Sequence, residues 1–129
     1  MQKIGNCAFK EAFHWKKKVS VTIPEKVNEV GEFCFSTSNV YEIIWKASAE
    51  TVKNEAFYYC YQLENVILGD SVKEISNRAF CDCISLKTLT LSGQLEQIGT
   101  EAFMFCKSLS EVIIPGSMND VGAHAFYRF

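Results

Sequence analysis

No apolar run in the 129-residue sequence approaches the roughly 20 residues that a membrane-spanning helix requires. We therefore expect no insertion into a membrane. The first nine residues, M-Q-K-I-G-N-C-A-F, also lack the apolar core of a signal peptide. Three explanations stay open at this point: the protein is cytoplasmic, its targeting segment lies outside this sequence, or it is exported by an unconventional route.

The sequence also has no large excess of positive or negative charge. The formal net charge is −2, and the only basic run is Lys16 to Lys18. A nucleic-acid groove would need a basic excess on one face, and a basic binding patch about 5–8 consecutive residues. We therefore expect no nucleic-acid partner and interpret the basic run as a solvated loop.

Residues for catalysis and metal binding are few. The only two histidines, His14 and His124, lie near opposite ends of the chain, which argues against a shared metal site. The sequence also has no glycine-rich loop of the kind that holds phosphate. We expect no enzyme activity, no catalytic residues, no cofactor and no metal.

What the sequence does contain is a repeat of 23 residues. The segment from Ile75 to Leu91 has counterparts 23 residues earlier and 23 residues later. A fixed period between about 20 and 50 residues indicates a solenoid or an array. Three apolar positions keep this spacing: Phe57, Phe80, Phe103 and Phe126; Cys60, Cys83 and Cys106; and Leu63, Leu86 and Leu109.

The repeats start near residues 4, 30, 52, 75, 98 and 121, and no linker or change of composition separates them. We therefore predict one solenoid domain over residues 1–129. One copy cannot bury its apolar residues alone, so neighbouring copies must stack. We expect the inner ladder of this stack to be Phe9, Phe35, Phe57, Phe80, Phe103 and Phe126.

Each repeat is predicted to hold a short strand, a turn, a return segment and one helical turn. The strand signal is alternation, as in Leu89, Thr90 and Leu91. The helical turn carries the Ala-Phe pair, and the polar residue before it should cap free backbone amides. These polar residues are Asn6, Asn54, Asn77 and Thr100. We interpret the glycines at the second repeat position (Gly5, Gly31, Gly99 and Gly122) as a turn requirement.

The six cysteines are too few for a disulfide scaffold. Cys60, Cys83 and Cys106 share one repeat position, so we favour a ladder of buried free thiols. Disulfides, and less readily a metal, remain alternatives. A nucleophile–base pair of Cys106 with His124 is disfavoured, because the cysteine belongs to the interior ladder and the histidine to a solvent position.

The segment from Ile98 to Pro115, I-G-T-E-A-F-M-F-C-K-S-L-S-E-V-I-I-P, resembles the BspA-type leucine-rich repeat, which is also described from treponemal surface proteins. Copy two departs from this pattern at Cys34, at Ser38 and at Trp45-Lys46, which puts its local geometry in doubt. The resemblance implies a curved solenoid with one strand per repeat. We therefore assign an α/β leucine-rich-repeat solenoid, β-rich, with about five and a half repeats of 23 residues and a concave parallel sheet.

Members of that family are typically surface or secreted proteins of bacteria and some protists, implicated in adhesion and in binding host proteins. The resemblance therefore suggests a cell-surface or secreted location, with the cytoplasm as the alternative. It also suggests a non-enzymatic module for protein–protein recognition or adhesion, with a protein ligand that the sequence does not identify.

The outward side of the concave strands is the candidate binding face. Its central row is Thr22, Ile44, Ile67, Thr90 and Ile113, and the row beside it includes Glu42, Asn65, Thr88 and Glu111. Exposed strands favour β-branched residues in any case, so strand propensity alone is an alternative explanation. Three isoleucines in line favour a mixed apolar and polar binding groove.

The two ends of the solenoid are the second candidate. We expect Phe13 and Trp15 to fold over the N-terminal end as a cap. At the other end, copy six stops before its strand, which would leave the predicted strand 109–114 as an open edge. The alternative function is thus a self-assembling structural module that forms a homodimer through Ile113, Phe126, Tyr127 and Phe129.

Overall fold

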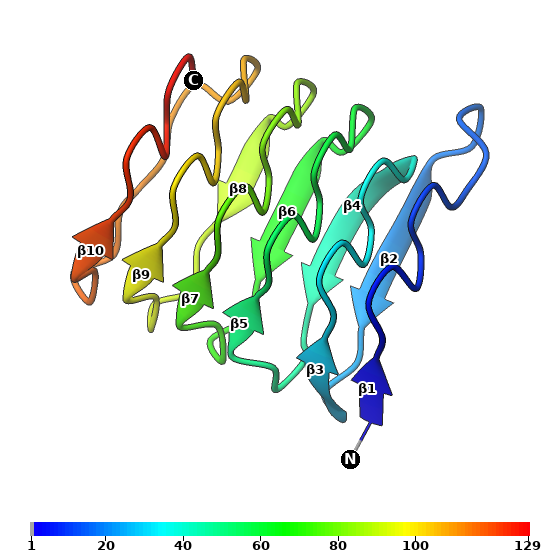
Figure 1. Cartoon of the computed structure of the whole chain (residues 1–129), viewed down its shortest axis with the longest axis horizontal. Coiled ribbons are helices and arrows are strands. Elements are labelled where there is room, and N and C mark those ends of the chain that lie inside the picture. Colours follow the sequence, from blue (N-terminus) through cyan, green and yellow to red (C-terminus); the bar gives the residue numbers. More distant parts are fainter. Residues whose placement is uncertain (1) are drawn as a thin grey trace.

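A computed structural model of the protein describes residues 2–129, in which it places ten β-strands and no helix. Met1, the first residue of the predicted domain, lies outside the described residues. The chain winds as a parallel β-solenoid with one turn per repeat (Figure 1). The predicted solenoid is therefore confirmed, but the α/β class is wrong.

Each of the first four repeats contributes one strand to a long parallel sheet, whose outward side we call the strand face. The strands follow in the order β2 (Val19–Ile23), β4 (Val40–Trp45), β6 (Asn65–Leu68) and β8 (Thr88–Thr90) (Figure 1). All pairs are parallel, as a solenoid requires, because every strand is entered from the same side.

Strands of two to four residues on the return side of each turn also pair in parallel. β1 (Gln2–Ile4) pairs with β3 (Val27–Val30). The remaining four form a second parallel sheet: β5 (Thr51–Val52), β7 (Glu74–Ile75), β9 (Gln97–Ile98) and β10 (Asp120–Val121). The predicted start of copy six near residue 121 therefore coincides with β10.

The segment around each Ala-Phe pair forms successive tight turns rather than the predicted helical turn. In copy four, Arg78 has a φ of 55° and Asp82 a φ of 62°, which no α-helix accommodates. Alternate amides point to the next repeat: Phe80 N–H donates to the Ala102 carbonyl at 2.8 Å, and Asp82 N–H to the Met104 carbonyl at 2.8 Å. These bonds between repeats replace the bonds within one helix.

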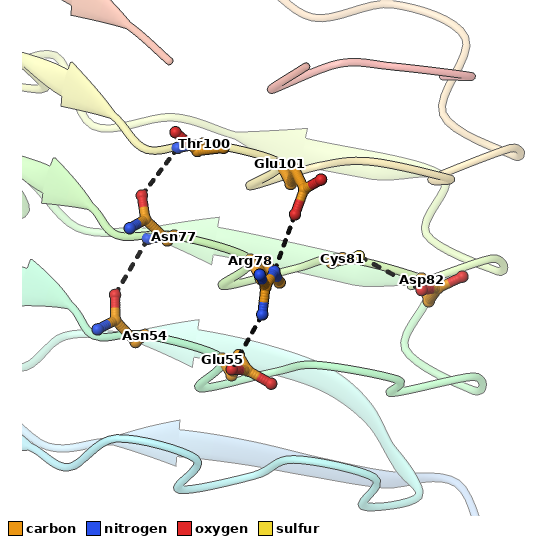
Figure 2. Close-up of polar contacts among 8 residues, drawn as sticks. All are labelled: Asn54, Glu55, Asn77, Arg78, Cys81, Asp82, Thr100 and Glu101. Carbon is orange, nitrogen blue, oxygen red and sulfur yellow. Dashed lines mark hydrogen bonds and ion pairs between the residues drawn. The ribbon is translucent and has the colours of Figure 1, made fainter. Parts of the chain in front are cut away.

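The polar residues before the Ala-Phe pairs join neighbouring repeats instead of capping a helix. Asn77 Oδ1 accepts the amide of Thr100 at 2.9 Å, and Asn54 Oδ1 accepts the amide of Asn77 at 3.2 Å (Figure 2). Asn6 Oδ1 accepts the amide of Glu32 in the same way at 2.9 Å. The sequence therefore identified Asn6, Asn54 and Asn77 correctly as hydrogen-bonding residues but assigned them the wrong partners, whereas Thr100 takes part through its backbone amide.

The glycines beside these asparagines serve close packing rather than a special backbone angle. Gly99 does not adopt a positive φ, but a Cβ built on it would lie 2.6 Å from the backbone nitrogen of Asn77. Gly31 meets Asn6 in the same way, at 2.4 Å. Their role is thus to let one repeat approach the next.

Stacked phenylalanines form the centre of the solenoid, which confirms the predicted ladder. Successive ring centroids from Phe9 to Phe126 are 5.0–5.3 Å apart, and the ring planes lie within 12° of parallel. The four central rings are fully buried, whereas Phe9 at the N-terminal end is 37% exposed. Copy two fits this core despite its departures: Trp45 is 1% exposed and Ser38 takes the cysteine position beside Cys60.

The ladder cysteines are interior thiols, as predicted. Each Sγ donates to a phenylalanine carbonyl of the preceding repeat: Cys60 to Phe35 and Cys83 to Phe57 at 3.1 Å, and Cys106 to Phe80 at 3.2 Å. Burial raises the pKa of Cys106 to about 12 and that of Cys34 to about 11. All six cysteines are free, and only Cys7 is exposed.

We expect a thiol reagent at pH 8 to label one cysteine of the native protein and six after denaturation. The reactive species is the thiolate, which burial and a raised pKa suppress. Mass spectrometry should place the single label on Cys7, and a Cys7→Ser variant should take up none. Rapid labelling of Cys83 or Cys106 before unfolding would contradict the buried ladder.

The predictions about the two ends need correction. Phe13 stacks on Phe9 at 6.2 Å, but Trp15 is 60% exposed and rests on His14, so only half of the expected N-terminal cap forms. At the other end, residues 109–114 form no strand, because none of their amides bonds to β8 within residues 2–129. The open edge of the strand-face sheet is therefore β8 itself.

Candidate functional site

The strand face brings most of the predicted central row together. Thr22 pairs with Ile44, Ile44 with Ile67, and Ile67 with Thr90. Ile67 is 43% exposed in the middle of this row, while Ile44 is half-buried. Ile113 continues the row by sequence but lies outside the sheet, with 78% of its surface exposed. The face thus presents a narrow apolar stripe between threonines.

The polar row beside it is also in register, and its side chains bond across the strands. Ser20 Oγ donates to Glu42 Oε1 at 2.7 Å, and Thr88 Oγ1 donates to Asn65 Oδ1 at 2.6 Å. Since Glu42 in turn pairs with Asn65, the row runs unbroken from β2 to β8. These bonds hold the polar side chains in fixed positions next to the apolar stripe.

A groove that the sequence did not indicate opens at the C-terminal side of this face. It has a volume of about 610 Å³ and lies between β8 and residues 110–115. Its walls include Leu89, Thr90, Glu111 and Ile113. The last predicted residue of each row, Ile113 or Glu111, therefore lies across a gap from the sheet rather than on it.

The opposite side of the molecule carries polar contacts that tie repeats together. The guanidinium of Arg78 lies between two carboxylates, 2.8 Å from Glu101 and 3.7 Å from Glu55 (Figure 2). These residues are 23 positions apart, so the repeat spacing could have revealed the pairing. Cys81 donates to its neighbour Asp82 at 3.3 Å, and burial raises its pKa to about 12. Because these groups already bond one another, we assign them a structural role.

The geometry does not assemble a catalytic pair from Cys106 and His124. The Cys106 thiol is buried and donates to a carbonyl, whereas His124 is exposed and packs against Tyr127 at 5.3 Å. Among residues 2–129, no three His, Cys, Asp or Glu side chains gather as a metal site would require. The described chain likewise has no helix with the length and apolar character needed to span a membrane.

Three of the four residues predicted for self-association, Phe126, Tyr127 and Phe129, lie in the last repeat, whereas Ile113 lines the groove beside β8. Tyr127 and Phe129 are 44% and 47% exposed, and Phe126 is half-buried as the last ring of the ladder. Phe129 packs edge-on against Phe126 at 5.8 Å and so covers part of it. The end remains an apolar surface.

Comparison with known proteins identifies a matching repeat family and solved structures with the same fold. A family profile described as "BspA type Leucine rich repeat region" matches residues 2–129 in six copies. No curated protein matches the chain in sequence. Solved leucine-rich-repeat proteins share the fold. One from Eubacterium ventriosum aligns with a TM-score of 0.88 and 26% identity, over 96% of this chain and 33% of its own.

Two further structures agree. A leucine-rich-repeat protein from Bacteroides ovatus has a TM-score of 0.77 and 34% identity, over 84% of this chain and 28% of its own. A leucine-rich-repeat protein of T. pallidum has a TM-score of 0.62 and 25% identity, over 97% of this chain and 47% of its own. The chain therefore spans less than half the length of each of these proteins.

Proposed function

Because the chain belongs to the BspA-type leucine-rich-repeat family, whose repeats generally serve protein interaction, we propose that it is a non-enzymatic module for protein–protein recognition or adhesion. The ligand is a protein that docks on the strand face, and a cell-surface or secreted location fits this role. The observation that carries the proposal is the exposed apolar stripe around Ile67, bordered by a hydrogen-bonded polar row. Solenoids commonly bind partners on such extended faces.

A charge placed in the centre of the stripe should abolish this binding without unfolding the domain. We expect Ile67→Glu to weaken the affinity for a protein ligand by about 2 kcal/mol or more, roughly 30-fold, because a buried contact would then hold an unpaired carboxylate. Affinity capture with the wild type, followed by calorimetry on each recovered and purified protein, measures the change.

Gln94→Glu is the matched control, since it adds the same charge at an exposed position on the return side of the repeat. It should retain every ligand at wild-type affinity. If Ile67→Glu also binds within twofold of the wild type, the strand face is not the binding surface.

A second function is favoured by the apolar C-terminal end, where Ile113 is 78%, Phe129 47% and Tyr127 44% exposed. Here we propose a structural module that dimerises through this end. Sedimentation over a concentration series should show a dimer at several hundred micromolar. Ile113→Lys and Phe129→Asp should shift it to monomer, whereas Trp15→Ser, which removes an exposed aromatic at the opposite end, should not. A wild type that stays monomeric throughout contradicts this function.

A further inference from the structure

Strand β8 is the open edge of the strand-face sheet. On the side of β6 this strand is paired, because the Thr88 N–H donates to the Glu64 carbonyl at 3.1 Å. Since neighbouring amides of a strand point to opposite edges, the Leu89 N–H and C=O point away from β6. Within residues 2–129, no backbone hydrogen bond joins residues 87–91 to residues 110–115.

The groove at this edge has an apolar floor that the next repeat leaves partly uncovered. Leu89 and Leu91 are half-buried, although their counterparts Val66 and Leu68 one repeat earlier are 0% and 4% exposed. Pro115, on the far wall of the groove, is half-buried as well. An extended segment lying in the groove would therefore cover the side chains of Leu89 and Leu91 and also form hydrogen bonds with the free backbone groups of Leu89.

The charges of the groove are not balanced. Lys87 on one wall already pairs with Glu64 at 3.4 Å. Glu111 on the other wall is exposed and makes no ion pair within the described residues 2–129. A basic side chain entering along Glu111 would complement it.

We propose that this groove binds an extended segment of the partner protein, which adds a parallel strand to β8. The segment alternates apolar residues, which lie beside Leu89 and Leu91, with small polar residues, and it carries a lysine or arginine near Glu111. Main-chain bonds supply affinity and alternate side chains supply selectivity in this mode of recognition. The inference rests on the proposed recognition function and specifies the form of its ligand.

The recessed position of the edge favours an extended segment over a second folded copy. The groove is walled on its far side by residues 110–115, so a sheet edge backed by its own repeats would collide with that wall. A single extended chain fits more easily, because a strand needs a spacing of only about 4.8 Å from the strand that it pairs with.

A peptide copied from this chain provides a defined probe. Residues 17–24, K-K-V-S-V-T-I-P, alternate apolar and polar residues behind two lysines, and their central part is β2, a parallel strand of this same sheet. In the register of the sheet, the peptide residue copying Ser20 lies beside Thr88. The residue copying Lys18 then lies two positions away on the same face, roughly 7 Å along the strand and within reach of Glu111.

Amide hydrogen exchange by NMR tests the inference on the wild-type domain. The Leu89 amide should exchange rapidly in the free protein. With the blocked 17–24 peptide at about ten times its dissociation constant, its exchange should slow by about tenfold, while amides of β4 stay unchanged. A peptide methylated on the nitrogens that copy Ser20 and Thr22, which would face β8, should give no protection.

A charge swap tests the position of the lysines. Replacing both peptide lysines by glutamate should weaken binding by about threefold, and the Glu111→Lys variant should restore it. A Leu89 amide already protected in the free protein would overturn the inference, since residues 110–115 would then close onto β8 themselves. Tight binding that needs Ile67 but leaves Leu89 unprotected would also overturn it, while leaving recognition by the strand face standing.

Discussion

Truncating one ring of the phenylalanine ladder, Phe80→Ala, should destabilise the domain by about 3–5 kcal/mol. Phe80 is fully buried and stacks on both sides, 5.0 Å from Phe57 and 5.1 Å from Phe103. The substitution removes apolar burial and leaves a cavity between two repeats that touch only their neighbours. Urea unfolding followed by circular dichroism measures the loss.

The position of Phe80 in the middle of the array adds a second expectation. Stability in a solenoid is a sum of terms between neighbouring repeats, so a weak central interface lets the two halves unfold separately. The unfolding transition should therefore broaden as well as shift, with a lower apparent m-value. Phe9→Ala is the control, because Phe9 lies at the end of the ladder and is 37% exposed. Equal losses from both variants would contradict nearest-neighbour stacking.

The ladder could be predicted because period and alternation together determine which side chains face inward. Phe80 and Cys83 recur every 23 residues, and a position that recurs in a stack meets its own copies above and below. The same reasoning placed Ile67 beside Thr90 on the outer side, since strand neighbours alternate between faces. Both predictions require only the spacing of residues along the chain.

The conformation around the Ala-Phe pairs could not be predicted in this way. Spacing of three and four residues, as from Phe80 to Cys83, suits a helical turn as well as two successive tight turns. The choice is made by amides that bond to the next repeat, such as Phe80 N–H to the Ala102 carbonyl. Such bonds join residues far apart in sequence, so local patterns do not reveal them.

The groove beside β8 shows a similar limit. Copy five matches the repeat pattern best in sequence, and its Leu109, Val112 and Ile114 keep the spacing of Leu86, Leu89 and Leu91 one repeat earlier. Yet a strand forms only where backbone partners lie alongside, and this segment pairs with β8 nowhere in the described chain. The groove therefore exists because residues 109–114 do not form the strand that the repeat predicts, and no residue in this segment indicates that difference.

Trp45 shows the opposite case, because it departs from the repeat pattern in sequence but still packs inside the core. It stands at the end of β4 where the family pattern has isoleucine, and it is only 1% exposed. Its register partners are Ile23 on β2 and Leu68 on β6, both buried. Its indole N–H donates to the Ala49 carbonyl at 3.4 Å, so the polar atom is satisfied inside the core.

We therefore expect Trp45→Ala to cost about 3–5 kcal/mol, because the largest buried side chain leaves a cavity that β2 and β6 frame on both sides. Trp45→Phe should cost clearly less, since it keeps most of the packing and loses one long hydrogen bond. Chemical unfolding gives both values. The same truncation at Trp15, which is 60% exposed, is the matched control and should stay within about 0.5 kcal/mol of the wild type.

Fluorescence supplies an independent measurement, because the chain has only these two tryptophans. In a Trp15→Phe background, emission should come from Trp45 alone, shifted to the blue and shielded from acrylamide until the domain unfolds. Strong quenching of Trp45 in the native state would show that copy two does not pack into the ladder as described. A Trp45→Ala variant as stable as the wild type would lead to the same conclusion, since a side chain that contributes no burial energy cannot be part of the core.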